Sequence, residues 1–384
     1  MLQNFYASIS KRFYFFEIVI LFYFSFLQFA YADPVQERPI ENRNLYIPNI
    51  FFFEPYPTTP KAIGEKKVSY LTGFSAANMI DNNNALGDRS DISKIKPIYW
   101  SALANEFYDG KLNFQSYSNA DFYLYGKLEQ QRNVFVDVEV YRANHRVSYG
   151  LSKKIEVSAE VTILSYNKGF LDSVITGYHR AINTAYPLRD IYPDDKFHYS
   201  ISDSSRILIN AKPRTSLGDS VFDIKWQFLD GSKYYPMMAL IVGTKIPTGH
   251  VAYSMGTGFF DFAGGLSMKY NFYDFFLFSN SFVKTNHKFF KSDEIQIIPT
   301  FQTAFTIGYH ITERWAPIIQ IEYKSSPYKT EIFPLFQPSI ILSFGFNYKY
   351  SESCSSRFHI AEDPAFESRT VPDVGGQISV FCIP

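Results

Sequence analysis

The sequence predicts an all-β fold, a transmembrane antiparallel up-and-down β-barrel of about 12 strands with one short helix in a long loop. Three observations indicate it. The chain starts with an export signal and has no later apolar stretch long enough for a spanning helix. Many segments alternate apolar and polar residues, and the connections between them alternate between short and long.

The first 32 residues have the order of a secretory signal peptide. Lys11 and Arg12 precede an apolar segment that ends at Phe29, and Ala30-Tyr31-Ala32 forms a small-x-small cleavage signal. The alternative is a permanent membrane anchor, because the segment is long for a signal peptide. We expect export and cleavage, so that the mature chain begins at Asp33.

Alternation with a period of two identifies the strands. In 221–228, VFDIKWQF, four apolar side chains share one face and Asp223, Lys225 and Gln227 share the other. The segments 155–163, 260–270 and 338–350 show the same pattern. In 237–250, MMALIVGTKIPTGH, Leu240 and Val242 are expected to face lipid and Lys245 the lumen, and Pro247 ends the strand.

The connections predict how the strands are joined. Strands are expected near 68–77, 134–149, 154–164, 219–229, 236–246, 258–271, 274–284, 298–309, 315–324, 337–350, 356–362 and 374–382. Short links such as 272–273 and 310–314 alternate with long ones such as 165–218 and 285–297. Outer-membrane barrels have this pattern, with the short turns in the periplasm. Residues 123–130 could add a hairpin and raise the count to 14.

Several short stretches, in order, resemble a known family. They are FVDVEVYR (135–142), VSYGLSKKIEVSAE (147–160), GFLDSVITGYH (169–179), LGD (217–219), KIPTG (245–249) and AED with PDV (361–363 and 372–374). The chain resembles an uncharacterised Gram-negative family of outer-membrane barrels, the domain of unknown function 3187. The resemblance implies the barrel fold and an outer-membrane location, and it supplies no catalytic residues.

The polar face of the strands gives the candidate lumen residues. We expect the following side chains to point inward: Asp137, Glu139, Glu156, Glu160, Asp223, Lys225, Lys245 and Lys269. Carboxylates opposite lysines can select charged solutes in a narrow pore. The alternative is an internal network of ion pairs that rigidifies a filled barrel.

Two further segments could occupy that lumen. Residues 33–67 carry six prolines around the run Phe51–Phe53, which makes them a candidate periplasmic plug or a tethered tail. Residues 167–182 have helical spacing and place Asp172 and His179 on one face. This helix could narrow the barrel mouth or pack on its rim. Two residues without a third ligand are weak evidence for a metal or acid–base site.

The two cysteines are expected to form a disulfide. If 356–362 and 374–382 form the last hairpin, its centre lies near Ser368, and Cys354 and Cys382 lie directly opposite each other. An oxidising compartment suits such a bond.

The leading functional hypothesis is a narrow or plugged outer-membrane channel for small solutes. The alternatives are a closed structural or surface-interaction barrel, an outer-membrane enzyme and a soluble periplasmic β protein. His145 and Ser148 suggest a lipase, but in one strand they point to opposite faces, so no enzyme activity is predicted.

The expected partners follow from the same reading. They are outer-membrane lipid, small solutes and the barrel-assembly machinery during biogenesis. Equal numbers of basic and acidic residues, 37 of each, argue against nucleic acid. No cofactor or metal is expected, and the oligomeric state is left open.

Overall fold

A computed structural model describes residues 37–43, 45–82, 134–174, 177, 195–203, 207–288, 292–332, 334–362, 370–372 and 374–384. The signal segment 1–32 and the candidate hairpin 123–130 lie outside these residues. Within the described part, no helix is long and apolar enough to cross a membrane.

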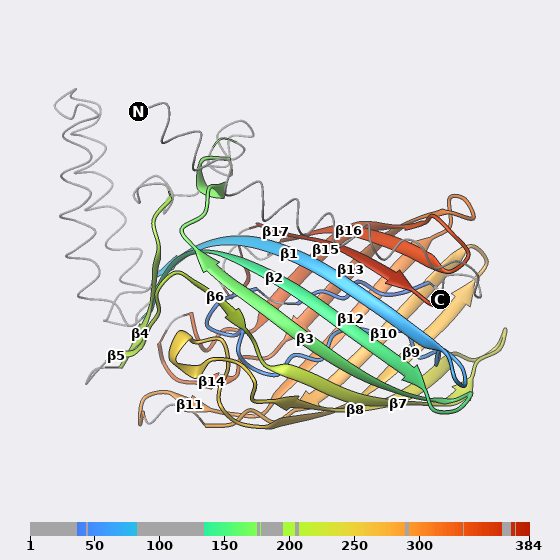
Figure 1. The fold of residues 1–384 in the computed structure, drawn as a ribbon, viewed down its shortest axis with the longest axis horizontal. Helices are drawn as coiled ribbons and strands as arrows, with labels where there is room; N and C mark the ends of the chain where they lie inside the picture. The colour runs from blue at the N-terminus through green and yellow to red at the C-terminus, as the bar shows by residue number, and fades with distance from the viewer. Residues whose placement is uncertain are drawn as a thin grey trace.

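Twelve long strands form the barrel (Figure 1). They are β1 (Val68–Asn82), β2 (Val134–Gly150), β3 (Ile155–Asn167), β7 (Ser220–Asp230), β8 (Met237–Ile246), β9 (Asp261–Phe272), β10 (Phe275–Lys284), β12 (Thr300–Tyr309), β13 (Trp315–Lys324), β15 (Ser339–Lys349), β16 (Cys354–Glu362) and β17 (Val374–Cys382). Each strand pairs antiparallel with its chain neighbour. Pairing of β1 with β17 closes the ring, so the predicted closed 12-stranded barrel is confirmed.

Short and long connections gather at opposite ends of the barrel, as the chain pattern predicts. The turn end carries the short links, such as 273–274 between β9 and β10 and 310–314 between β12 and β13. The loop end carries the short strands β4 (His198–Ser202), β5 (Ile207–Asn210), β6 (Arg214–Leu217), β11 (Gln296–Ile297) and β14 (Tyr328–Lys329), and the 3₁₀ turn η1 (Val251–Tyr253). There the first residues of β2 pair with β4, and β11 pairs with β14.

The outer face of the barrel is apolar. On β7, Phe222, Ile224, Trp226 and Phe228 are exposed, while the residues between them are buried. The same holds on β8, where Leu240 and Val242 are exposed and Lys245 is buried. Exposed aromatic residues follow at the turn end, among them Tyr235, Tyr273, Tyr309 and Trp315. An apolar band with an aromatic girdle is what lipid contact requires.

Candidate functional site: the barrel interior

The inner face of the wall is polar and charged. Glu156, Glu160, Asp223, Lys225 and Lys245 all lie on it and are buried. Lys269 lies on the same face of β9, near the turn end, with a side chain that is 13% exposed. Six of the eight residues proposed from alternation therefore point into the barrel.

We call residues 37–67 the N-terminal segment, and its residues 37–43 and 45–63 occupy the lumen (Figure 1). Glu37 contacts Lys269 and His310 at the turn end. The chain then rises to the loop end, where Tyr328 donates a hydrogen bond to the carbonyl of Pro48. It descends again, and the amide of Lys66 donates to the carbonyl of Gly150, the last residue of β2, at 2.8 Å. The segment thus enters and leaves the barrel at the same end.

At the turn end the segment is anchored by ion pairs and by polar wall side chains. Glu37 lies 2.6 Å from Lys269 and 2.7 Å from His310. On the returning arm, the amide of Ala62 donates to Gln227 and that of Ile63 donates to Glu156. Burial raises the pKa of Glu37, but the nearby Lys269 and His310 outweigh it, so the net pKa is lowered.

Halfway along the barrel, wall side chains bind the backbone of the segment. The amide of Ile40 donates to Oε1 of Gln320, and Nε2 of Gln320 donates to the carbonyl of Ile40, both at 3.0 Å. The Gln320 side chain therefore acts as a neighbouring strand would, satisfying both backbone groups of one residue. Arg43 of the segment pairs with Glu160 of β3 at 2.6 Å.

At the loop end two buried lysines hold the apex. Nζ of Lys245 lies 2.9 Å from both Asp219 and Asp261 and donates to the carbonyl of Phe51 at 3.1 Å. Lys324 of β13 pairs with Glu54 of the segment and lies 3.4 Å from Glu322 on its own strand. Each lysine is thus shared between the wall and the segment.

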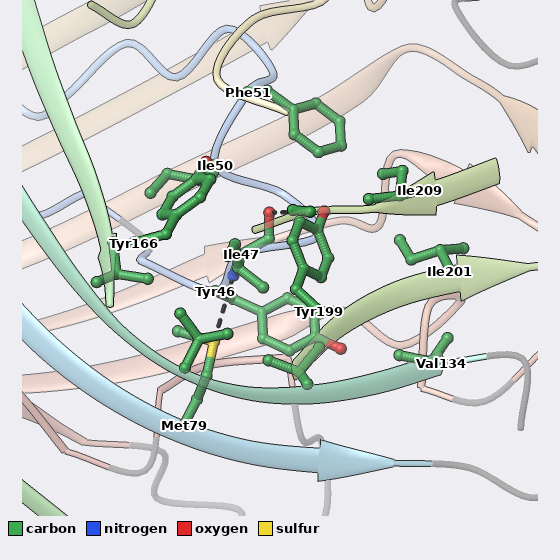
Figure 2. Packing of buried hydrophobic residues seen from close by; sticks show 14 of the residues in the cluster. Tyr46, Ile47, Ile50, Phe51, Met79, Val134, Tyr166, Tyr199, Ile201 and Ile209 are labelled. Atoms are coloured by element: carbon green, nitrogen blue, oxygen red, sulfur yellow. Dashed lines mark hydrogen bonds between the residues drawn. The ribbon is translucent and has the colours of Figure 1, made fainter. Parts of the chain in front are cut away.

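An apolar cluster surrounds this apex (Figure 2). Tyr46, Ile47, Ile50 and Phe51 of the segment pack with Met79, Val134, Tyr166, Tyr199, Ile201 and Ile209 from the strands. The amide of Ile47 faces the sulfur of Met79 at 3.4 Å. The apex at the loop end is therefore held by apolar packing as well as by the two lysines.

This cluster corrects the expected orientation of Asp137 and Glu139. Arg142 and Asn144 are buried on the inner face of β2, and the β1–β2 register runs without a bulge to residue 135. Period two therefore turns Val136, Val138 and Val140 inward, into the apolar cluster. Asp137 and Glu139 lie on the outer face. The rule that polar side chains face the lumen fails here because the segment makes this part of the lumen apolar.

The outer cluster around Glu139 also includes Asp172. Glu139 accepts hydrogen bonds from the amide of Phe170 at 2.7 Å and from the hydroxyl of Tyr141 at 2.5 Å. Asp172 accepts from Nδ2 of Asn78 and from the amide of Asp195, both at 2.8 Å. Residues 171–174 are helical, and they pack on the outer face of β1 and β2 rather than in the barrel mouth. His179 lies outside the described residues.

The remaining sequence candidates are structural in their contacts. Ser148 is buried inside the barrel and hydrogen-bonds with Ser158, whereas His145 lies on the outer face beside Thr72. Cys354 and Cys382 are directly opposite in the β16–β17 register and form a disulfide. Among the described residues no group of three or more His, Cys, Asp or Glu side chains is placed to hold a metal ion.

Sequence reasoning missed several inner residues. Gln320, Glu322 and Lys324 alternate with exposed apolar residues along β13, and Arg357 does so on β16. The same alternation that identified Lys225 identifies them. Arg43 could not be found in this way, because its segment forms no strand.

Three of the cavities beside the segment are small. Arg43 lines three cavities, with Ile341 and His359, with Phe51 and Lys245, and with Tyr56 and Asp223. Their volumes are about 20 to 30 Å³. A cavity of this size holds one or two water molecules.

Comparisons with known proteins agree with this architecture. A family model described as Protein of unknown function (DUF3187) matches residues 113–380. The crystal structure of the COG4313 outer membrane channel from Pseudomonas putida F1 is similar, with a TM-score of 0.51 and 8% identity, over 86% of this chain and 100% of that chain. A FadL homologue of Pseudomonas aeruginosa has a TM-score of 0.37 and 11% identity, over 92% of this chain and 99% of that one. No curated protein matches the sequence.

Proposed function

The chain belongs to the family described as Protein of unknown function (DUF3187), and from that premise we propose that it is an outer-membrane channel for small solutes. In this proposal residues 1–32 are a cleaved signal peptide, and residues 33–67 are a plug. Residues 68–384 form the barrel that spans the bacterial outer membrane, in contact with its lipid. The plug closes the lumen, and solutes pass when it moves aside.

The observation that carries the proposal is the polar chemistry between plug and wall. Wall side chains reach the plug backbone at Ile40, Phe51, Pro55, Thr58, Thr59, Ala62 and Ile63. Water can replace each of these hydrogen bonds when the plug leaves. A wall with charged inner residues is therefore ready to become the lining of an aqueous path.

A closed scaffold is the second candidate. The plug is attached at both ends of the lumen, and the apolar cluster at its apex is that of a permanently filled barrel. Against this, a purely structural filling gains little from buried ion pairs. Well-packed apolar residues of similar volume are often equally or more stable than such pairs. The charged middle of the barrel therefore favours a channel.

The first test is planar-bilayer conductance of the refolded protein, with and without residues 37–63. We expect rare, brief openings from the full chain and steady conductance from the shortened chain. Heat-modifiable gel migration must first show that both are folded barrels. A folded, shortened barrel that never conducts would contradict the channel and favour the scaffold.

A reversible lock provides the control for the full chain. Ile40→Cys with Gln320→Cys joins the plug to β13 at a point where the two already exchange two hydrogen bonds. Oxidation is expected to abolish openings, and a reductant is expected to restore them. The unmodified protein, treated with the same reductant, controls for the native disulfide between Cys354 and Cys382.

A further inference from the structure

We infer that the opened lumen is an anion path, selective for small carboxylates, and that three glutamates of the plug occupy its anion sites in the closed state. This inference rests on the proposed function. It is carried by the way in which wall and plug share their ion pairs.

The wall neutralises its own acidic side chains. Glu156 lies 3.0 Å from Lys225, and Asp261 lies 2.9 Å from Lys245. The remaining three wall carboxylates have Arg146 or Lys324 within 3.9 Å; they are Glu160, Asp223 and Glu322. Every one of these pairs remains when the plug leaves, so the acids add little negative potential to an open lumen.

Two basic side chains of the wall instead have their ion-pair partners in the plug. Lys269 pairs with Glu37 at 2.6 Å, and Arg357 pairs with Glu41 at 3.1 Å. Among the described residues, neither of these bases has a wall carboxylate within 4.0 Å. Lys324 forms ion pairs with both Glu54 of the plug and Glu322 of the wall. Withdrawal of the plug therefore exposes cations and leaves the wall acids paired.

The charge balance of the inner wall points the same way. We count the charged strand side chains on the inner face that are at most 13% exposed. Among the described residues eight are basic, namely Arg142, Arg146, Lys225, Lys245, Lys269, Lys284, Lys324 and Arg357, and five are acidic, namely Glu156, Glu160, Asp223, Asp261 and Glu322. Asp219, which precedes β7 and pairs with Lys245, adds a sixth buried acid. An excess of two positive charges on low-dielectric walls concentrates anions in the lumen.

The cations that lose a plug partner are distributed along the path. Lys324 lies at the loop end of β13, whereas Lys269 and Arg357 lie near the turn end of β9 and β16. Each of the three binds a carboxylate in the closed state. The guanidinium of Arg357 has the planar donors that suit a carboxylate group. A small organic acid can therefore replace Glu54, then Glu41 and Glu37, as it crosses.

The test is the reversal potential of the protein lacking residues 37–63, measured in a potassium chloride gradient and then with potassium acetate. We expect a reversal potential whose sign indicates anion selectivity, and we expect acetate to permeate. Lys269→Gln and Arg357→Gln are expected to shift the potential toward zero. Lys154→Gln, which removes an exposed charge of the turn end outside the lumen, should leave it unchanged.

The outcomes separate this inference from the function on which it rests. Conductance with cation selectivity, or with chloride passing and acetate excluded, overturns the inference and leaves the channel standing. Absence of conductance from a folded barrel overturns both. If the shortened chain does not fold, the full chain with Glu37→Gln, Glu41→Gln and Glu54→Gln replaces it. More frequent openings with anion selectivity support the inference, and cation-selective openings overturn it.

Discussion

Single side chains decide how the plug is held, and Arg43 is one of them. Its guanidinium pairs with Glu160, donates to the carbonyl of Glu54 and lies 4.5 Å above the ring of Tyr56. It connects β3 with both arms of the plug. Removing it leaves Glu160 with Arg146 as its remaining ion-pair partner, at 3.9 Å.

Arg43→Ala is therefore expected to loosen the plug without opening the wall. Breaking a buried ion pair by removal of one partner costs about 3 to 5 kcal/mol. Amide hydrogen exchange of residues 46–63 should become faster, while exchange in β12 and β13 stays the same. Arg314→Ala removes an exposed guanidinium of the turn between β12 and β13 and serves as the matched control. Unchanged exchange in the plug would show that Arg43 does not hold it.

Glu37 makes the turn-end anchor sensitive to acid. Its pKa is lowered from the ordinary value of 4.5, because Lys269 and His310 outweigh the opposing effect of burial. A lowered pKa contributes stability above the ordinary value, and that stability is lost as the pH falls through the lowered value. We expect the protection factors of residues 38–43, that is, exchange relative to the unfolded chain at the same pH, to fall below about pH 4.5. This pH dependence should become weaker in Glu37→Gln. An unaltered pH profile in that variant would contradict the role of Glu37 as the acid-sensitive group.

At the scale of elements, the last hairpin closes the barrel and carries its covalent link. β17 pairs with β16 on one side and with β1 on the other, so fraying of β17 would open the ring. The disulfide between Cys354 and Cys382 joins β16 and β17 at the turn end, beside Tyr70 of β1. It therefore stabilises the seam at which the first and last strands meet.

Cys354→Ser with Cys382→Ser is expected to lower the free energy of unfolding by about 3.5 kcal/mol, from the closure of a loop of this length. The measurement is a denaturant titration followed by heat-modifiable gel migration. Reduction of the native protein should give the same loss. A midpoint equal to that of the oxidised protein would show that strand pairing alone holds the seam.

For the whole molecule, the tryptophans report whether the outer face contacts lipid. Trp226 on β7 and Trp315 at the start of β13 are 50% and 45% exposed on that face. Trp226 lies within its strand, whereas Trp315 lies at the turn end with the aromatic girdle. The two differ in expected depth because such girdles lie at the membrane interface.

Two variants separate these signals. Trp100→Phe with Trp315→Phe retains Trp226, and Trp100→Phe with Trp226→Phe retains Trp315. In vesicles with bromine deep in the acyl chains, Trp226 should be quenched more strongly than Trp315. Equal weak quenching of both would place the outer face in water and contradict a membrane barrel.

The alternation of side chains let the sequence predict the twelve barrel strands, with fourteen left open, and the six inward residues from Glu156 to Lys269. The reason is local, because a period of two assigns every second side chain to one face. The symmetry of the last hairpin likewise predicted that Cys354 and Cys382 lie opposite each other. These inferences need no knowledge of what fills the barrel.

Only the tertiary structure decided what each face contacts. Val136 and Val138 turn inward, and Asp137 and Glu139 outward, because the apolar apex of residues 46–52 lies in the lumen and residues 170–172 cover the outer face. The partners of Lys269, Lys324 and Arg357 likewise come from a segment without strand periodicity, more than 200 residues away in the chain. Alternation gives the direction of a side chain, but its partner depends on long-range packing, which no local pattern encodes.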